Sequence, residues 1–182
     1  MKQSNLGAGA ARNIGIQHAK GDYLFFADAD DYCELDLLEK TLKKAKEHDA
    51  DIVAFDDYRF FDDGKSELHS GININRLPKG IEVFSYKDVP EYICAIVNVT
   101  PWNKLISREF VVKNNIRFME LSTSNDITFS ALCNIFAKRI AFVKFPLPTI
   151  TTFLVLIDMN FPPFIHCSYA YFNKYCRVFL SK

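Results

Sequence analysis

The sequence lacks an excess of either charge: its 182 residues include 22 Lys and Arg against 22 Asp and Glu. Proteins that bind nucleic acid or an anionic membrane surface usually carry a basic excess, so we expect neither partner. The composition is not that of a disordered chain either, because 49% of the residues are hydrophobic and 24% are charged. The length suits one globular domain, or one domain with an appendage.

Paired cysteines and long apolar runs are also missing. The five cysteines form no CxxC pair, and an odd, scattered set of this kind is typical of reduced thiols in the cytosol. The N-terminal sequence MKQSNLGAGAARN has no apolar stretch of a secretory signal. The run TFLVLIDMNFPPF is interrupted by Asp158 and contains two prolines, so it is too short and too broken for a membrane span. We expect a cytoplasmic protein, or one that works at the cytoplasmic face of a membrane through a partner.

Hydrophobic periodicity predicts an α/β protein in which helices and strands alternate. Apolar positions at helical spacing predict one inner face formed by Leu35, Leu38, Leu42 and Ala45. Helices are expected over residues 7–20, 35–49, 86–98, 108–115, 125–139 and 168–182, and strands over 22–27, 51–61 and 139–145. Such an order favours crossover connections, with ligands bound beyond the carboxyl ends of the strands.

An acidic cluster follows the first expected strand in the stretch YLFFADADDY. Its carboxylates belong to Asp28, Asp30 and Asp31, and like charges this close repel one another unless water or a cation compensates them. Carboxylates bind hard cations such as Mg²⁺ or Mn²⁺, which then bridge to phosphate oxygens. Taken alone, the cluster favours a solvated turn between a strand and a helix over a metal site.

Two other motifs share part of this pattern. A calcium-binding loop would use Asp28, Asp30 and Glu39, but Tyr32 and Cys33 then occupy the fifth position and the sharp-turn position that needs glycine, which excludes it. A phosphatase with an aspartyl nucleophile also begins with an apolar strand and DxD. It would need Thr or Val in place of Tyr32, and it stays a weaker alternative.

A longer pattern surrounds the acidic cluster. The run NLGAGAARNIGIQHAKGDYLFFADADDYCELDLLEKTLKKA resembles the middle of the family 2 glycosyltransferases of GT-A fold. DIVAFDDYRFF resembles the next strand of that family, and WNKLISREFVVKNNIRF is similar to its NKL segment. The resemblance extends from residue 4 to about residue 144, and its individual signatures are an NxG start, ARNxG, AKGDY and DADD.

The resemblance implies the fold and its boundaries. We expect a partial GT-A (Rossmann-like) nucleotide-diphospho-sugar transferase domain over residues 1–145, lacking its first strands, and a divergent tail over residues 146–182. A sheet without those strands would expose an apolar edge and favour association. The alternative function is a non-catalytic remnant, or a fragment that needs a partner to supply the missing half.

The resemblance also implies the chemistry and its donor-side residues. Such enzymes transfer a sugar from a nucleotide-diphosphate donor, foremost a UDP-sugar, to a hydroxyl of a glycan, lipid-linked or other acceptor in polysaccharide or cell-surface glycan synthesis. By this resemblance Asp28 lies near the ribose, Asp30 holds Mn²⁺ or Mg²⁺ against the diphosphate, and Asp31 supports the metal. Arg12 and Lys104 would contact the donor. The alternatives are a structural ion pair from Arg12 to Asp28 or Asp31, and a solvated Lys104.

The expected general base is Asp126. Inverting enzymes of this family place an acidic pair at the start of the helix that follows the NKL segment, and here that position reads Asn125-Asp126. Asp126 matches the base, which takes the proton of the acceptor hydroxyl. Asn125 departs from the family pattern. The alternative for Asp126 is an ordinary acidic residue in the first turn of a helix.

Overall fold

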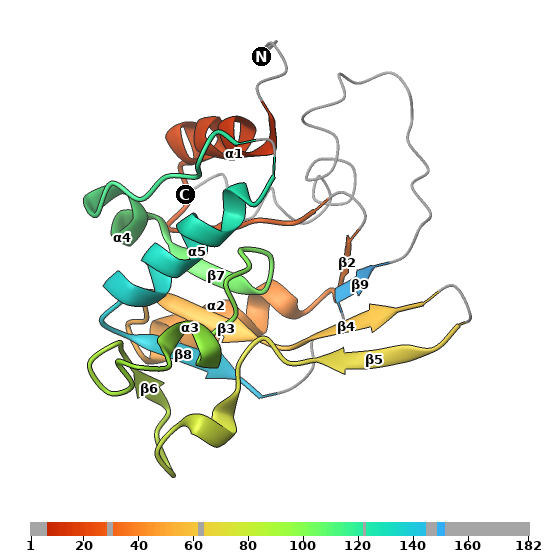
Figure 1. Cartoon of the computed structure of the whole chain (residues 1–182), viewed down its shortest axis with the longest axis vertical. Helices are drawn as coiled ribbons and strands as arrows, with labels where there is room; N and C mark the ends of the chain where they lie inside the picture. Colours follow the sequence, from red (N-terminus) through yellow and green to blue (C-terminus); the bar gives the residue numbers. More distant parts are fainter. Residues whose placement is uncertain (1–6, 29–30, 62–63, 122, 145–148, 152–182) are drawn as a thin grey trace.

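The structure is a computed structural model that describes residues 7–28, 31–61, 64–121, 123–144 and 149–151 (Figure 1). The expected helix over residues 168–182 lies outside these ranges, as do the side chain of Asp30 and most of the expected tail. None of the described helices is both long and apolar enough to cross a bilayer.

A five-stranded sheet forms the centre of the fold. Its strands are β1 (Tyr23–Phe25), β3 (Ile52–Phe55), β6 (Val83–Phe84), β7 (Lys104–Ser107) and β8 (Ile140–Val143). They lie in the order β1-β7-β3-β8-β6. β3 and β8 are parallel, and the other pairs are antiparallel, so β1, β3 and β8 all run in one direction. Their carboxyl ends therefore lie at the same end of the sheet.

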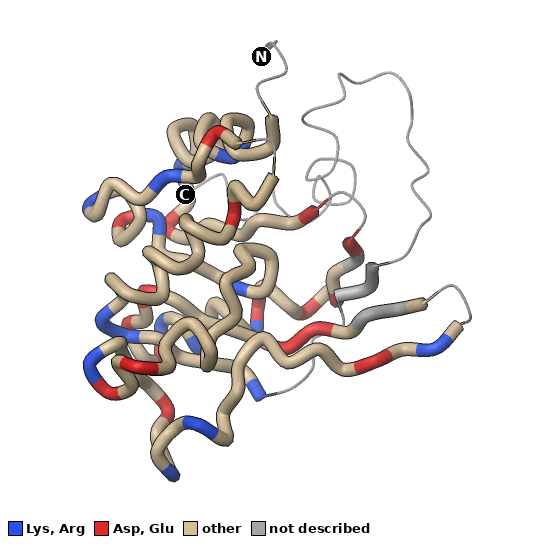
Figure 2. The backbone as a smooth tube through the Cα atoms, viewed as in Figure 1, with Lys and Arg blue, Asp and Glu red and all other residues tan. Residues whose placement is uncertain are grey.

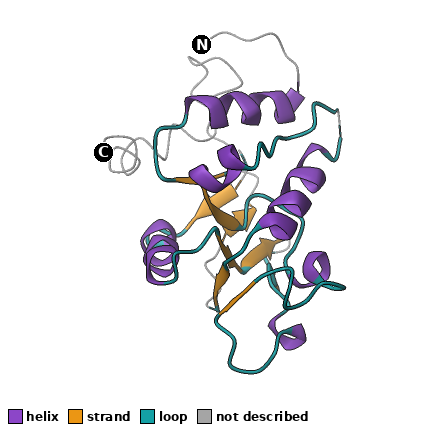
Figure 3. Ribbon diagram, turned by 90° about the vertical axis from the view of Figure 1, so that its left-hand side faces the viewer, coloured by secondary structure: helices purple, strands orange, loops and turns teal. Residues whose placement is uncertain are grey.

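Helices cover both faces of this sheet (Figure 3). They are α1 (Gly7–His18), α2 (Leu37–Glu47), α3 (Ile93–Ile96), α4 (Arg108–Lys113) and α5 (Asn125–Phe136). Every residue of β3 is buried, because alternate side chains enter opposite cores. Ile52 packs in the larger core with Phe129 of α5, whereas Val53 packs with Ala45 of α2. The mixed α/β class expected from the sequence is confirmed.

A second, smaller sheet extends from one end of the first. It contains β2 (Asp31–Cys33), β4 (Asp57–Phe60), β5 (Ser66–His69) and β9 (Thr149–Thr151), in the order β2-β9-β4-β5. β4 and β5 form an antiparallel hairpin whose turn includes Gly64, with φ at +80°, a conformation that favours glycine. β9 lies beyond residue 145, where the sequence pattern loosens, and it pairs with both β2 and β4.

Three details of the predicted elements are wrong. The expected strand over residues 51–61 is two strands, β3 and β4, which belong to different sheets. The expected helix over residues 86–98 is reduced to α3, which has four residues. Leu35 precedes α2 and is 70% exposed, so it does not join the inner face, whereas Leu38, Leu42 and Ala45 do.

Candidate active site

Arg12 joins three segments that are far apart in the sequence. Its Nη2 lies 2.6 Å from Oδ1 of Asp28, in the segment that follows β1. Its Nη1 donates a hydrogen bond of 2.9 Å to Oδ1 of Asn125, the first residue of α5. The ion pair with Asp28 is the structural alternative that the sequence left open for Arg12. The same guanidinium thus holds the acidic segment beside the N-terminus of the helix that carries Asp126.

The next residue, Asn13, fixes α1 in place from the buried side. Its side-chain amide donates to the carbonyl of Phe118 at 2.9 Å and accepts from the backbone N–H of Phe118 at 2.8 Å. The Phe118 ring stacks on Phe129 of α5, with centroids 3.9 Å apart and planes at 7°. The Arg12 guanidinium lies over the other side of this group, 5.4 Å from the Phe118 centroid. Paired hydrogen bonds and ring stacking therefore set the position of Arg12.

Close backbone packing explains a glycine in the same helix. A Cβ atom at Gly9 would lie 2.1 Å from the carbonyl oxygen of Met119 and 3.2 Å from Cβ of Asn125. Only glycine lets α1 approach this segment without displacement. The small residues early in the helix thus bring Arg12 within reach of Asn125.

The acidic cluster forms a tight turn between β1 and β2. The backbone N–H of Asp31 donates to the carbonyl of Asp28 at 3.2 Å, which brings the two residues into one turn. Figure 2 shows acidic segments where the chain leaves β1 and where β2 and β4 begin. Among the described residues, which do not include Asp30, no three metal-binding side chains form a group. The predicted metal role of Asp30 and Asp31 stays a prediction.

Asp126 lies in the first turn of α5, directly after the Asn125 that Arg12 binds. Its side chain is partly buried, whereas Asn125 is buried. The preceding Ser124 adopts a left-handed conformation with φ at +55° and makes no side-chain capping bond. Asn125, which departs from the family pattern, thus has a structural function as the acceptor for Arg12. The catalytic role of Asp126 remains a prediction.

Lys104 does not face solvent, so the alternative of a solvated side chain is wrong, while its predicted contact with a donor stays a prediction. Its side chain is fully buried, and its Nζ donates to the carbonyls of Asn98 at 2.5 Å and Thr100 at 2.6 Å. A third bond of 2.9 Å goes to Oδ1 of Asn103. Burial lowers the pKa of Lys104 to about 7, although nearby Cys133 and Asp57 act in the opposite direction. Lys104 therefore orders the loop before β7.

Sequence analysis missed a second polar pair, Asp57 and His69, at the base of the β4–β5 hairpin. His69 Nδ1 lies 3.0 and 3.1 Å from the two carboxylate oxygens of Asp57, and the Trp102 ring lies 5.9 Å from the His69 ring. Asp57 was visible as the third acid of DIVAFDDYRFF. Its partner was not, because only the register of the hairpin brings His69 opposite it.

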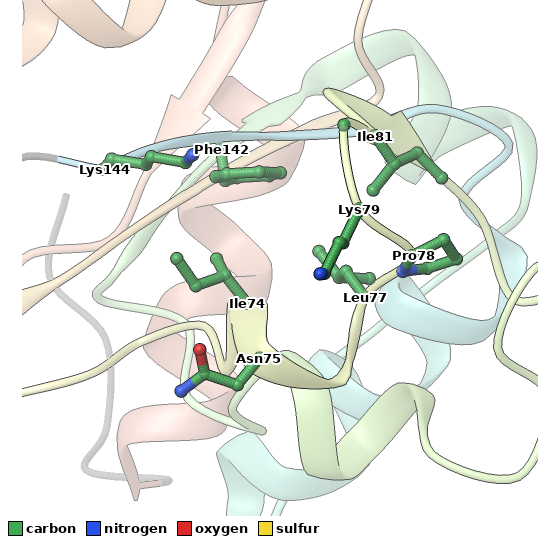
Figure 4. Close-up of a pocket in the computed structure, with 9 residues that line it drawn as sticks. Ile74, Asn75, Leu77, Pro78, Lys79, Ile81, Phe142 and Lys144 are labelled. Atoms are coloured by element: carbon green, nitrogen blue, oxygen red, sulfur yellow. The ribbon is translucent and has the colours of Figure 1, made fainter.

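A cavity of about 270 Å³ lies elsewhere, beyond the end of β8 (Figure 4). It is lined by the segment from Ile74 to Ile81 together with Phe142 and Lys144. The side chains of Lys79 and Lys144 approach it from opposite sides, above apolar residues. None of the site residues predicted from the sequence lines this cavity.

Comparison with known families and proteins identifies the family of the chain. The model of a family described as "Glycosyl transferase family 2" matches residues 1–112. The chain belongs to this family. EpsH of Bacillus subtilis, which carries the name of a glycosyltransferase, is 32% identical over 154 residues, or 80% of this chain and 42% of EpsH. The cholesterol galactosyltransferase of Borreliella burgdorferi is 32% identical over 147 residues, or 78% of this chain and 41% of that protein.

Solved structures confirm the fold. Residues 1–349 of Staphylococcus aureus TarS match with a TM-score of 0.65 and 21% identity, over 84% of this chain and 42% of the TarS chain. The fold is similar to the GT-A glycosyltransferase domain of TarS. The same TarS fragment has been crystallised with UDP-GlcNAc, and that structure matches with a TM-score of 0.63 at 19% identity, over 82% of this chain and 40% of that one. The chain thus spans about two fifths of these relatives.

Proposed function

We propose that the chain takes part in metal-dependent, inverting transfer of a sugar from a nucleotide-diphosphate donor to an acceptor hydroxyl, in polysaccharide or cell-surface glycan synthesis. The observation that carries this proposal is the position of Arg12, which binds both Asp28 and Asn125. One side chain thereby connects the acidic turn with the helix that begins Asn125-Asp126. Family membership and the UDP-GlcNAc complex of TarS support a nucleotide-sugar donor, with UDP as the first nucleotide to test.

Asp28 is suited to hold the donor. Its ion pair with Arg12 involves Oδ1, and 37% of its side-chain surface remains exposed. A carboxylate fixed in this way can accept a hydrogen bond from a ribose hydroxyl without reorganising. Arg12 would then contribute by fixing Asp28 and by adding positive charge near the diphosphate.

The acidic turn also offers the ligands that a hard cation prefers. Asp28 and Asp31 are joined by a backbone hydrogen bond across the turn, and carboxylate oxygens are typical ligands of Mg²⁺ and Mn²⁺. Asp30 and Asp31 are the proposed ligands of this ion. A bound cation would offset the negative charge that develops on the leaving diphosphate.

Asp126 is the proposed general base. It accepts the proton of the acceptor hydroxyl while that oxygen forms a bond to the anomeric carbon. The bond from the anomeric carbon to the phosphate oxygen breaks, and the nucleoside diphosphate leaves with the electron pair. Attack from the side opposite the leaving group inverts the anomeric configuration. The bond from Arg12 to Asn125 supports this role, because it fixes the first turn of α5.

Calorimetry with UDP-sugars in the presence of Mn²⁺ tests the proposal on the whole chain. We expect saturable heat that requires the metal, is lost in Asp30→Ala and is retained in the control Glu91→Gln, which changes an exposed acid elsewhere. A folded protein that gives no heat with any UDP-sugar contradicts the proposal. Binding without release of UDP would instead support the alternative of a donor-binding fragment that needs a partner for catalysis.

A further inference from the structure

The Asp57–His69 pair has the geometry of an oriented imidazole. Asp57 on β4 and His69 on β5 are direct partners in the hairpin register. The Asp57 side chain is only 4% exposed, whereas that of His69 is 25% exposed. Both carboxylate oxygens lie within 3.1 Å of Nδ1 of His69. The buried acid therefore fixes the direction of a ring that remains partly exposed.

This contact also determines which ring nitrogen can bind a ligand. A carboxylate accepts hydrogen bonds, so Nδ1 of His69 donates its proton to Asp57. In the neutral ring Nε2 then carries a lone pair and can accept a hydrogen bond from a hydroxyl.

Trp102 places an aromatic surface beside the same imidazole. The two ring centroids are 5.9 Å apart, with their planes inclined at 39°. Trp102 is half-buried and is the single tryptophan of the sequence. An aromatic face next to an oriented polar group matches a sugar ring, which has an apolar face of C–H bonds and a rim of hydroxyls.

The sheet register places this pair of rings at the donor end of the fold. Phe25 of β1 pairs with Leu105 of β7, which in turn pairs with Val53 of β3. Asp28 lies three residues beyond Phe25, and Trp102 lies three residues before Leu105 on an antiparallel strand. Both segments therefore leave the sheet at the same end, within about 10 Å of this row at ~3.3 Å per residue.

The second sheet leads to the same conclusion. Asp31 lies on β2, which is separated from β4 and its Asp57 by the single strand β9 (Figure 1). Neighbouring strands are about 4.8 Å apart, so β2 and β4 are separated by roughly 10 Å.

We propose that His69 and Trp102 form a saccharide subsite beside the acidic turn, which binds a sugar unit of the acceptor. His69 Nε2 accepts a hydrogen bond from a sugar hydroxyl, and Trp102 packs against the apolar face of the ring. Asp57 acts as a positioning residue that holds His69. This inference rests on the proposed transfer to an acceptor hydroxyl and specifies the class of acceptor group.

The fluorescence of Trp102 provides a direct test, because no other tryptophan contributes to the emission. The whole chain is titrated with the methyl glycosides of glucose, galactose and N-acetylglucosamine. We expect a saturable change in emission with at least one of them. His69→Asn should weaken this binding by about tenfold, because the Asn amide can still donate to Asp57 but lacks Nε2. His18→Asn, a change of an exposed histidine on α1, is the matched control and should bind like the original protein.

Two results would overturn the subsite. One is an emission spectrum that no glycoside changes, and the other is unchanged binding in a folded His69→Asn variant. Calorimetry with UDP-sugar and Mn²⁺ on the same samples separates this failure from failure of the proposed function. Donor heat without a glycoside response refutes only the subsite. A glycoside response without donor heat refutes donor binding and retains a sugar site at Trp102.

Discussion

Arg12 Nη2 lies 2.6 Å from Asp28 Oδ1, although the two residues belong to a helix and to the segment that follows the next strand. The other terminal nitrogen of the same guanidinium binds Asn125, 113 positions away. Because guanidinium is planar and has several donors, it can hold both partners at once in a fixed relation. The ARN signature thus connects three segments. Arg12 binds the side chains of Asp28 and Asn125, and Asn13 binds the backbone of Phe118.

Replacing Arg12 by lysine tests whether the site needs both bonds of the guanidinium, to Asp28 and to Asn125. Lysine keeps the positive charge but cannot form both bonds in the same geometry. We expect UDP-sugar affinity to fall by about tenfold, as when one charge-assisted hydrogen bond is lost. The Arg12–Asp28 pair is partly exposed, with side chains 21% and 37% exposed, so stability should fall by no more than about 1 kcal/mol. Calorimetry and urea unfolding measure the two effects, and Arg76→Lys, an exposed site, is the control. Unchanged affinity would contradict a role in the site.

Two glycines of α1 provide a matched pair of substitutions. Gly9→Ala places a Cβ 2.1 Å from the backbone oxygen of Met119, so α1 must move away from Asn125. We expect a loss of about 1–3 kcal/mol in the free energy of unfolding, as in other overpacked sites. A Cβ at Gly15 meets nothing within 4 Å. Gly15→Ala should therefore stabilise the helix by about 0.5–1 kcal/mol. Urea unfolding of both variants checks the difference, and equal effects would show that close packing at Gly9 is unimportant.

Asn13→Ala removes both hydrogen bonds to the backbone of Phe118. Those backbone groups are buried, so their loss of partners should cost about 1–3 kcal/mol. Asn114 is the control, because it is exposed and its single side-chain bond, 2.8 Å to the carbonyl of Phe110, duplicates one from its own backbone. Asn114→Ala should change stability by less than about 0.5 kcal/mol. Thermal or urea unfolding measures both. If Asn13→Ala and Asn114→Ala lower the free energy of unfolding equally, the two hydrogen bonds of Asn13 to Phe118 do not contribute to stability.

The parts of the fold that could be predicted are those encoded by local periodicity. The helical patterns over residues 7–20, 35–49 and 125–139 correspond to α1, α2 and α5, each shortened at one or both ends. The break between β3 and β4 could not be predicted, because two acidic residues between an apolar run and an aromatic one do not by themselves end a strand. It depends on Asp56, whose carboxylate binds Ser70 and the backbone N–H of Gly71, and these contacts are not local.

The same limit applies to the site. Arg12 and Asp28 were predicted together because a family pattern contains both, but the sequence left open whether Arg12 pairs with Asp28 or with Asp31, and the structure shows the pair with Asp28. Lys104 was expected to contact the donor or to be solvated, because a lone lysine is rarely fully buried. Its burial follows from the carbonyls of Asn98 and Thr100, which the loop turns inward. Such acceptors are backbone atoms, which side-chain patterns do not reveal.

Asp126→Asn separates a catalytic base from an ordinary acid in a helix. The amide keeps the size of the side chain but cannot take up a proton. We expect UDP release from UDP-sugar with Mn²⁺ to slow by about 10²–10⁴-fold, while the calorimetric affinity for the donor is unchanged. Glu109 is also an acid in the first turn of a helix, and Glu109→Gln should leave the rate as it is. If the two variants behave alike, Asp126 is only a helix-terminal acid.

The lowered pKa of the buried Lys104 predicts that the stability of the protein rises with pH in the alkaline range. Burial lowers its folded-state pKa to about 7 from the ordinary value of 10.5. Between these values the unfolded chain binds more protons than the folded one, so the free energy of unfolding rises with pH from about 7 to about 10.5. The slope from this group is at most about 1.4 kcal/mol per pH unit. Lys104→Met lacks the group, so urea unfolding of both proteins at several pH values should show a difference in stability that grows in favour of lysine as pH rises. A constant difference would mean that the ammonium keeps its ordinary pKa, with its three oxygen acceptors fully offsetting its removal from water.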